Sequence, residues 1–249
     1  MPTLHSAQKL DTLLPHGLSR WLVLDRLPDT LQRLYELEEM PAYVPLYVRT
    51  RLARNLAQSP LLVAANDPRS ALWQTFVEGY GESPLRGVII TSHAPQTEVA
   101  AHLRTRLEVR FYGQRRGLLR FYDPWIAAHL FSPPGTGNAW LGPLERVVWH
   151  GGTFEQRAEA GSQWYAFATA EPEAAVSSLA SPQSEDSAPA LSPDQEAAME
   201  RFAMRWPLWR QRIEHHALDE HSQAHAQHFI NACREEERYP PGNHQGNKR

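Results

Sequence analysis

The stretch LLRFYDPWIAAHLF, residues 118–131, decides how the middle of this chain folds. An apolar run with one arginine stops at Asp123 and Pro124, then resumes with helical instead of alternating spacing. Asp123 can accept free backbone N–H groups at a helix start, and proline at the first helical position sacrifices no hydrogen bond. The sequence therefore predicts a strand-to-helix junction, with a helix over residues 124–131. Asp123 is expected to act as its cap, and Arg120 to help fix the turn through hydrogen bonding.

Short apolar runs alternate with amphipathic stretches on both sides of this junction. The strand-like runs cover residues 21–24, 43–48, 61–65, 87–91, 146–149 and 163–169. Apolar residues recur at helical spacing over residues 29–39, 70–80 and 96–107. Proline cannot donate to a sheet ladder, so Pro45 marks its run as an edge strand or a break. The alternation predicts an α/β fold, with a mixed sheet and flanking helices.

Two aromatic-rich runs precede the junction, and they flank a glycine-bounded segment. Residues 109–112 and 118–122 surround the five residues GQRRG, which predicts a β-hairpin. Arginines gather around it, at Arg104, Arg106, Arg110, Arg115, Arg116 and Arg120. Basic residues interleaved with aromatics can bind a nucleic acid, but nothing else in the chain extends the basic patch, which favours a solvated hairpin tip. We favour the solvated tip and expect no nucleic-acid partner.

A change of composition divides the chain. Residues 171–191 are rich in Ala, Ser and Pro and contain four acids, no base and no aromatic residue, which is typical of a linker. The predicted organisation is an α/β lobe over residues 1–170, a flexible linker over 171–191, a small all-helical lobe over 192–238 and a disordered tail over 239–249.

The helical lobe opens with a capping-box pattern, Ser-Pro-Asp-Gln, at residues 192–195. Large apolar residues then recur at spacings of three and four, which places them on one stripe of a helix that bends at Pro207. The stripe consists of Met199, Phe202, Trp206, Trp209 and Ile213. Two interpretations stay open: the stripe packs as core against the first lobe, or it forms a partner-binding face that holds cargo between the lobes.

Charge and composition exclude several classes of protein. The formal net charge is −3, from 25 basic and 28 acidic residues, so there is no global attraction to nucleic acid or to an anionic membrane. The single cysteine, Cys233, excludes an internal disulfide framework. The first residues lack an apolar signal-peptide core, and no window approaches a membrane span. These features predict a cytoplasmic protein without stable membrane association.

Residue types that carry chemistry do not form a recognisable constellation. His221, His225 and His228 lie at i, i+4 and i+7, so all three are predicted to share a helical face, but HExxH is absent and packing histidines are favoured over metal ligands. The G-x-S-x-G elbow and the Lys-Ser/Thr pair of a phosphate-binding loop are absent too. We therefore expect no enzyme activity, no cofactor and no metal. The alternatives are an α/β enzyme of unrecognised type and a His-rich metal-binding module.

The stretch around the junction also resembles a known family. LLRFYDPWIAAHLF followed by WLGPLERVVW is similar to the signature block of bacterial type VI secretion effector chaperones, also called adaptors. The matching residues are Arg120, Tyr122, Asp123, Pro124, Gly142, Pro143 and Trp149. The resemblance covers approximately residues 18–150. It implies a non-enzymatic protein with two partners: the N-terminal or transmembrane, tip-associated region of a cognate toxic effector, and the secretion spike.

Overall fold

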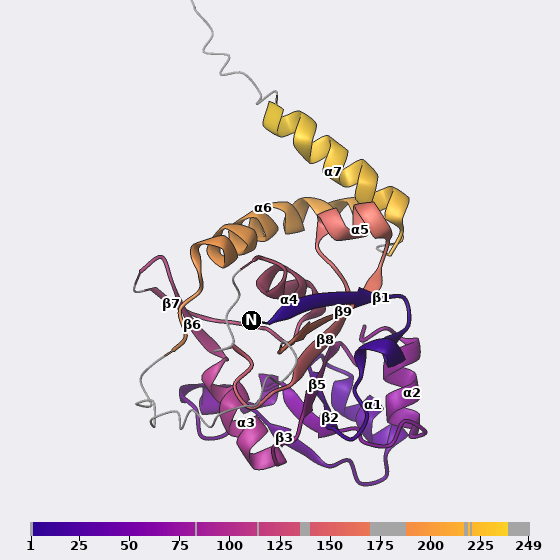
Figure 1. Ribbon diagram of the computed structural model, residues 1–249, viewed down its shortest axis with the longest axis vertical. Coiled ribbons are helices and arrows are strands. Elements are labelled where there is room, and N and C mark those ends of the chain that lie inside the picture. The colour runs from indigo at the N-terminus through magenta and orange to yellow at the C-terminus, as the bar shows by residue number, and fades with distance from the viewer. Residues whose placement is uncertain are drawn as a thin grey trace, which may run out of the picture.

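The computed structural model describes residues 2–82, 84–113, 115–134, 140–169, 188–216, 219 and 221–238 (Figure 1). The strands are β1 (Thr3–Ala7), β2 (Ser19–Leu24), β3 (Tyr43–Pro45), β4 (Leu61–Ala64), β5 (Gly87–Ser92), β6 (Glu108–Phe111), β7 (Arg115–Leu118), β8 (Arg146–Gly151) and β9 (Gln163–Ala168). The α-helices are α1 (Thr30–Leu37), α2 (Ala71–Glu78), α3 (Gln96–Thr105), α4 (Pro124–Phe131), α5 (Phe154–Ala160), α6 (Pro193–His216) and α7 (Gln223–Arg238). Two segments are 3-10 helices, η1 (Leu10–Leu13) and η2 (Arg51–Gln58).

Seven strands form the central sheet, in the order β1-β9-β8-β5-β2-β4-β3. The predicted α/β class is confirmed, but every pairing in this sheet is antiparallel, so the expectation of a mixed sheet needs correction. The strands β4 and β5, which are joined through α2, both run antiparallel to β2 and hence parallel to each other. They are not neighbours because β2 lies between them.

Both faces of the sheet are buried, and the strand sequences show why. Successive side chains of a strand point to opposite faces. In β2, Trp21 and Val23 join one apolar cluster, while Leu22 and Leu24 join the other. The first cluster includes side chains of α3 and α4, and the second includes side chains of η1, α1 and α2. The result is a sheet with a helical layer on each face (Figure 1).

Two predicted strands end earlier than expected. Pro45 does lie in an edge strand, but β3 stops there and a turn follows, in which the Val48 N–H donates to the Pro45 carbonyl at 3.4 Å. The hairpin also differs. Its second strand is β7, which begins at Arg115 inside the predicted connection and ends at Leu118.

The reason lies in the turn and in the competing core. Tyr112 and Gly113 both have positive φ, of 43° and 80°, and a tight turn at this point replaces the five-residue connection. Beyond the strand, Leu119, Phe121 and Tyr122 are buried in the main core instead of pairing in the hairpin. Packing of these large side chains therefore decided where the hairpin ends.

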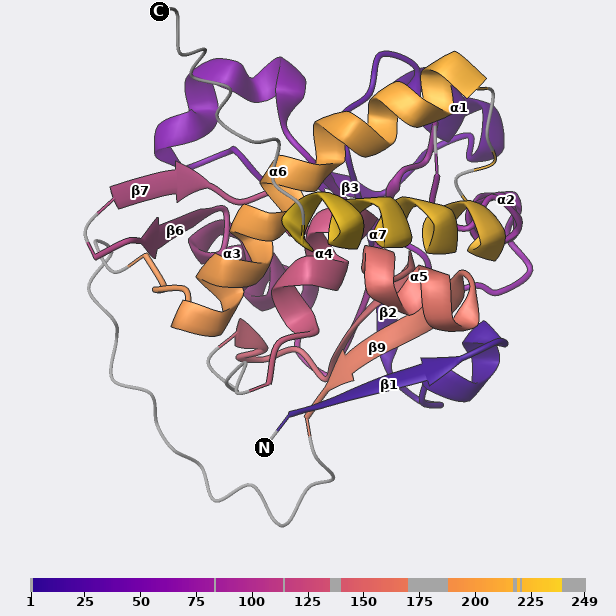
Figure 2. The ribbon, with the colours of Figure 1, turned by 90° about the horizontal axis from the view of Figure 1, so that it is seen from above.

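The C-terminal helices form a third layer. The helix α6 packs on α4, and α7 packs on α5 (Figures 1 and 2). Most of the predicted linker lies outside the described residues, as does the predicted tail. The last linker residues, 188–191, are described and lie along β6, where the Arg110 N–H donates to the Pro189 carbonyl at 2.8 Å. The described helices include no candidate for a membrane span.

Candidate functional site

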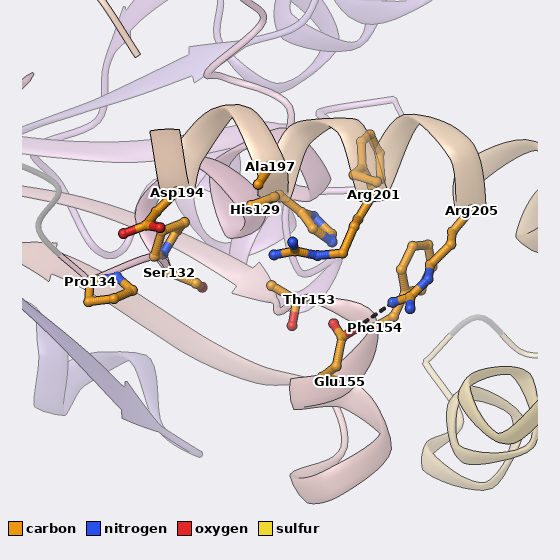
Figure 3. A pocket seen from close by; sticks show the side chains of 13 residues that line it. His129, Ser132, Pro134, Thr153, Phe154, Glu155, Asp194, Ala197, Arg201 and Arg205 are labelled. Atoms are coloured by element: carbon orange, nitrogen blue, oxygen red, sulfur yellow. Dashed lines mark hydrogen bonds and ion pairs between the residues drawn. The ribbon is translucent and has the colours of Figure 1, made fainter. Parts of the chain in front are cut away.

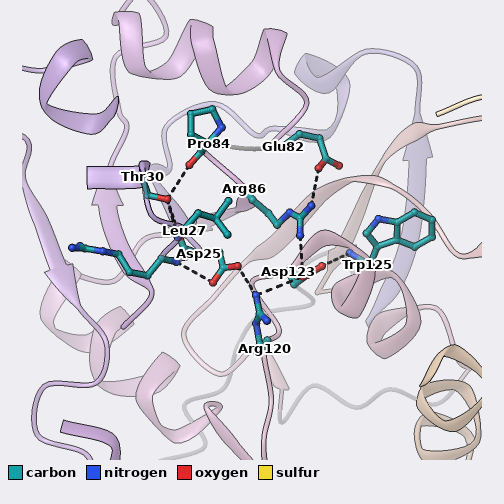
Figure 4. Close-up of polar contacts among 10 residues, drawn as sticks. Asp25, Leu27, Thr30, Glu82, Pro84, Arg86, Arg120, Asp123 and Trp125 are labelled. Atoms are coloured by element: carbon teal, nitrogen blue, oxygen red, sulfur yellow. Dashed lines mark hydrogen bonds and ion pairs between the residues drawn. The ribbon is translucent and has the colours of Figure 1, made fainter. Parts of the chain in front are cut away.

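The helix at the Asp123 junction has the structure that the sequence predicts, but a turn and not a strand precedes it: β7 ends at Leu118, and the Asp123 N–H donates to the Arg120 carbonyl at 2.9 Å. Asp123 is the N-cap of α4, and its Oδ1 accepts the backbone N–H of Trp125 at 2.9 Å. Pro124 occupies the first helical position. The helix α4 is therefore started by the two residues that interrupt the apolar run (Figure 4).

Asp123 also belongs to a polar network that joins three parts of the chain. Its carboxylate lies 3.8 Å from the Arg86 guanidinium and 3.9 Å from that of Arg120. Arg120 donates in turn to Asp25, which follows β2, and Arg86 lies 3.5 Å from the Glu82 carboxylate. The network ties the end of β2 and the segment before β5 to the start of α4 (Figure 4).

The electrostatics of Asp123 fit a structural role. Burial raises the pKa of its carboxyl group, while the neighbouring guanidinium groups of Arg86 and Arg120 act in the opposite direction. Burial of a carboxylate costs free energy, and the hydrogen bond and the two cations offset this cost. The predicted function of Arg120 in fixing the turn takes the form of a bridge between Asp25 and Asp123.

The other residues of the block also face inward. Tyr122 and Trp149 are buried, and Trp149 stacks on Tyr165 with ring centroids 6.0 Å apart. Pro143 accepts a hydrogen bond from the Ser92 hydroxyl through its carbonyl. Gly142 has φ of +54°, and a Cβ atom there would lie 2.3 Å from the His102 ring. The block thus builds the scaffold, because each of these residues serves a turn or the core.

The aromatic stripe of α6 is packed against the first lobe. Phe202 and Trp209 are buried, and Trp206 and Ile213 pack on the same apolar cluster. Met199 packs instead on the main core. We call the cluster the aromatic seam; its buried members are Trp125, Phe154, Ala158, Phe202, Trp209, Ala226, Phe229, Ile230 and Cys233. This arrangement agrees with the interpretation of the stripe as core. A cargo segment could contact the stripe only if α6 moved away from α4.

Trp125 is the centre of the seam, and the sequence did not single it out as such. Its ring lies 5.1 Å from Trp206 and 5.0 Å from Phe154, between centroids. The buried Arg157 guanidinium lies over the same ring at 3.7 Å. One signal was available: the run PWIAAHLF is apolar on every side, and a helix of this kind is buried all round.

A cavity of about 310 Å³ lies beside the seam, between the end of α4, the start of α5 and the first half of α6 (Figure 3). Its lining is mixed. Phe154 and Phe202 supply apolar walls, and the polar lining residues are His129, Ser132, Thr153, Glu155, Asp194, Arg201 and Arg205. Glu155 and Arg205 form an ion pair within it. Because its charges are balanced, the cavity has no strong preference for an ion of either sign.

The contacts in this cavity do not form a catalytic pair. The His129 Nδ1 lies 2.8 Å from the Trp125 carbonyl oxygen, which can only accept, so Nδ1 carries the proton. Burial lowers the pKa of His129 to about 4 and keeps the ring neutral. Ser132 bonds the Gln156 amide, at 3.2 Å, and not the imidazole. Among the described contacts, then, no serine is activated by a histidine.

The three candidate histidines do not share a helical face. The helix α7 begins at Gln223, because Ser222 accepts the His225 N–H at 3.4 Å and starts the helix. His221 therefore precedes the helix and lies 5.9 Å from the His150 ring, so the predicted common face was wrong for this residue. Within the described part of the chain, no group of three or more His, Cys, Asp or Glu side chains is arranged to hold a metal ion.

Comparison with known proteins adds one finding. Residues 20–135 match the family Domain of unknown function (DUF4123). The DUF4123 region takes in a little under half of the chain, from β2 to the end of α4, and so contains the Asp123 network. It ends before β8 and before the C-terminal helices. No curated protein and no solved structure matches the chain.

Proposed function

We propose that this protein is a type VI secretion effector adaptor that acts in the cytoplasm without catalysis. It binds the N-terminal region of one toxic effector, stabilises that region and loads it onto the secretion spike. The observation that carries the proposal is the DUF4123 match over residues 20–135, which is consistent with such adaptors and includes the Arg-x-Tyr-Asp-Pro block. A scaffold that binds partners needs no reactive group of its own.

The chemistry of the matched block supports a binding role. Its polar residues are engaged in ion pairs and hydrogen bonds within the chain, as Asp123 and Arg120 illustrate. An enzyme of this fold class would instead place reactive groups in a cleft, within reach of a substrate. The polar cavity beside the seam lacks an activated nucleophile among its described contacts.

Co-expression tests the proposal. The protein is produced together with a toxin whose gene neighbours its own, and the toxin is measured in the soluble fraction and after affinity capture of the adaptor. We expect capture of the toxin, and a several-fold loss of soluble toxin when the adaptor is omitted, because exposed apolar segments aggregate when uncovered. A toxin from an unrelated secretion cluster is the control. Equal solubility and secretion of the toxin without the adaptor would contradict the proposal.

A further inference from the structure

The sheet edges of this protein differ in how they are protected from pairing with another strand. An edge strand presents unpaired backbone N–H and C=O groups, and charged side chains, proline or a short length protect it. At one end of the central sheet, β3 has only three residues and ends at Pro45. In the hairpin, β6 pairs with β7 and bonds residues 188–191, so β7 is the outer strand, and it carries Arg115, Arg116 and Gly117. Both edges are therefore poor templates for a further strand.

The other end of the central sheet has none of these protections. It is the strand β1, whose five residues, TLHSA, include no lysine, arginine, carboxylate, proline or glycine. Within the described part of the chain β1 pairs with β9 alone, and Thr3, His5 and Ser6 are exposed. Figure 2 shows β1 at the margin of the molecule, with β9 between it and the rest of the sheet. In an antiparallel ladder every second residue directs its N–H and C=O away from the partner strand, so β1 presents such groups outward.

The two faces of β1 indicate which side chains a neighbouring strand should carry. Leu4 and Ser6 point to one face, on which Leu4 packs against the main core. Thr3, His5 and Ala7 point to the other face, where the Thr3 hydroxyl lies 2.7 Å from the His5 Nε2. Side chains of paired strands interact with their neighbours on the same face. An added strand should therefore place an apolar side chain beside Leu4 and a polar one beside His5, which is an alternating pattern.

We call the outer side of the Thr3–Ala7 backbone the β1 edge. We propose that the β1 edge binds an extended segment of the effector by strand addition, and the inference rests on the proposed function in taking the effector as the partner. Strand addition needs a backbone whose own groups are unpaired, whereas most backbone groups of a folded protein are already paired. A region that an adaptor must stabilise is not folded by itself, so it can offer such a backbone.

A second copy of this chain fits the β1 edge less well. A ladder of five residues spans about 17 Å, which is too short to bury by itself the roughly 1,200 Å² of a stable dimer. An effector segment can add contacts beyond the strand, because the chain continues past it on both sides. The length of β1 therefore favours a partner that binds elsewhere on the protein too.

Amide hydrogen exchange in the full-length protein, free and with the captured effector, tests the proposal without any substitution. The outward N–H groups of residues 3–7 should exchange at least about tenfold more slowly in the complex, because they become hydrogen-bonded. Residues 115–118 of β7 are the internal control, and their exchange should not change. A complex in which residues 3–7 exchange as in the free protein would overturn the inference, while the adaptor function stands.

A pair of proline substitutions tests the backbone itself. Successive residues alternate in direction, so one of His5→Pro and Ser6→Pro removes an outward N–H and the other removes a bond to β9. The variant that keeps its unfolding midpoint is the outward one, and it should capture the effector at least about tenfold more weakly. The controls His5→Ala and Ser6→Ala keep the N–H and should capture the effector fully. Full capture by the outward proline variant would contradict the proposal, and if both proline variants unfold, the exchange measurement decides.

A defined probe distinguishes a failure of this inference from a failure of the proposed function. The probe is a labelled peptide of alternating valine and threonine with a lysine at each end, followed by fluorescence anisotropy. If the unaltered protein binds this peptide, and the outward proline variant does not, but no effector is captured, the adaptor function fails and the β1 edge is retained as a binding site. If neither the peptide nor the effector binds, both proposals fail. A dimer in sedimentation that the outward proline variant abolishes would assign the β1 edge to a second copy and overturn the choice of partner.

Discussion

At the scale of single residues, Asp123 is subject to two opposing effects on the ionisation of its carboxyl group. It caps α4, which requires an acceptor at the helix start, and it is buried, which disfavours the charged form. The cations of Arg86 and Arg120 keep the carboxylate in place. A single residue therefore joins the local start of a helix to the packing of three chain segments.

Substitution of Asp123 separates these tasks. We expect Asp123→Ala to lower the free energy of unfolding by about 1–3 kcal/mol, because the cap and the partner of two guanidinium groups are both lost. Asp123→Asn should cost less, since asparagine also caps and each arginine keeps a second carboxylate, at Glu82 or Asp25. Chemical denaturation measures both variants. Equal losses in the two would show that the charge, and not the cap, is what matters.

Gly142 tests a second residue-scale feature, the close approach of the backbone to His102. We expect Gly142→Ala to destabilise the protein by more than about 1 kcal/mol, because the new Cβ must displace the ring that bonds the Trp140 carbonyl. Gly17→Ala is the matched control: Gly17 also has positive φ, of +78°, but a Cβ atom there meets nothing within 4 Å. Equal unfolding midpoints for the two variants would assign the whole effect to backbone strain.

His129 provides a pH-dependent prediction. Burial lowers its pKa to about 4, whereas an unfolded histidine titrates near 6.5, so the unfolded chain binds more protons between these values. The stability it contributes is complete above pH 6.5 and is lost as the pH falls towards 4, by about 3 kcal/mol in full. We expect His129→Gln to flatten the plot of unfolding free energy against pH in this window. The exposed His16→Gln is the control, and an unchanged slope in His129→Gln would contradict the assignment.

At the scale of elements, α6 illustrates how one pattern is compatible with two functions. Its stripe of large apolar residues has the spacing of a core helix and the composition of a partner-binding face. Trp125 of α4 and Phe154 of α5 meet this stripe and bury Trp209 completely. The contacts of the neighbouring elements, and not the stripe itself, make α6 part of the core.

Truncation of Trp209 measures this packing. We expect Trp209→Ala to lower the free energy of unfolding by about 3–5 kcal/mol, the range for a large aromatic residue removed from a core. Met204 lies on the opposite side of the same helix and is 62% exposed, so Met204→Ala should change stability by less than about 0.5 kcal/mol. If Trp209→Ala were as stable as the unaltered protein, the interpretation of the stripe as a partner-binding face would be favoured instead.

At the scale of the whole molecule, the aromatic seam joins the C-terminal helices to the α/β lobe by packing. The helices α6 and α7 cover apolar surface on α4 and α5, although the DUF4123 region stops at residue 135. Residues 188–191 also pair with β6. The two predicted lobes are therefore joined by packing and by backbone hydrogen bonds.

Removal of the C-terminal helices should expose that surface. We expect a chain that ends at residue 170 to aggregate, or to bind a fluorescent apolar dye strongly, because Trp125 and Phe154 lose their cover. Size-exclusion chromatography and dye fluorescence against the full chain measure this. A monomeric truncated protein without dye binding would show that the α/β lobe is independent.

The sequence by itself determined the features that depend on residues close together in the chain. The cap at Asp123 and the first helical position of Pro124 follow from hydrogen bonding within a few residues, and Pro45 limits its run to an edge strand or a break. Tertiary structure alone decided which distant segments are neighbours. It places β2 between β4 and β5, Arg157 over the Trp125 ring, and η2 against the β6–β7 hairpin. These contacts join segments far apart in the chain, where side-chain shape and burial, and not local propensity, select the neighbours.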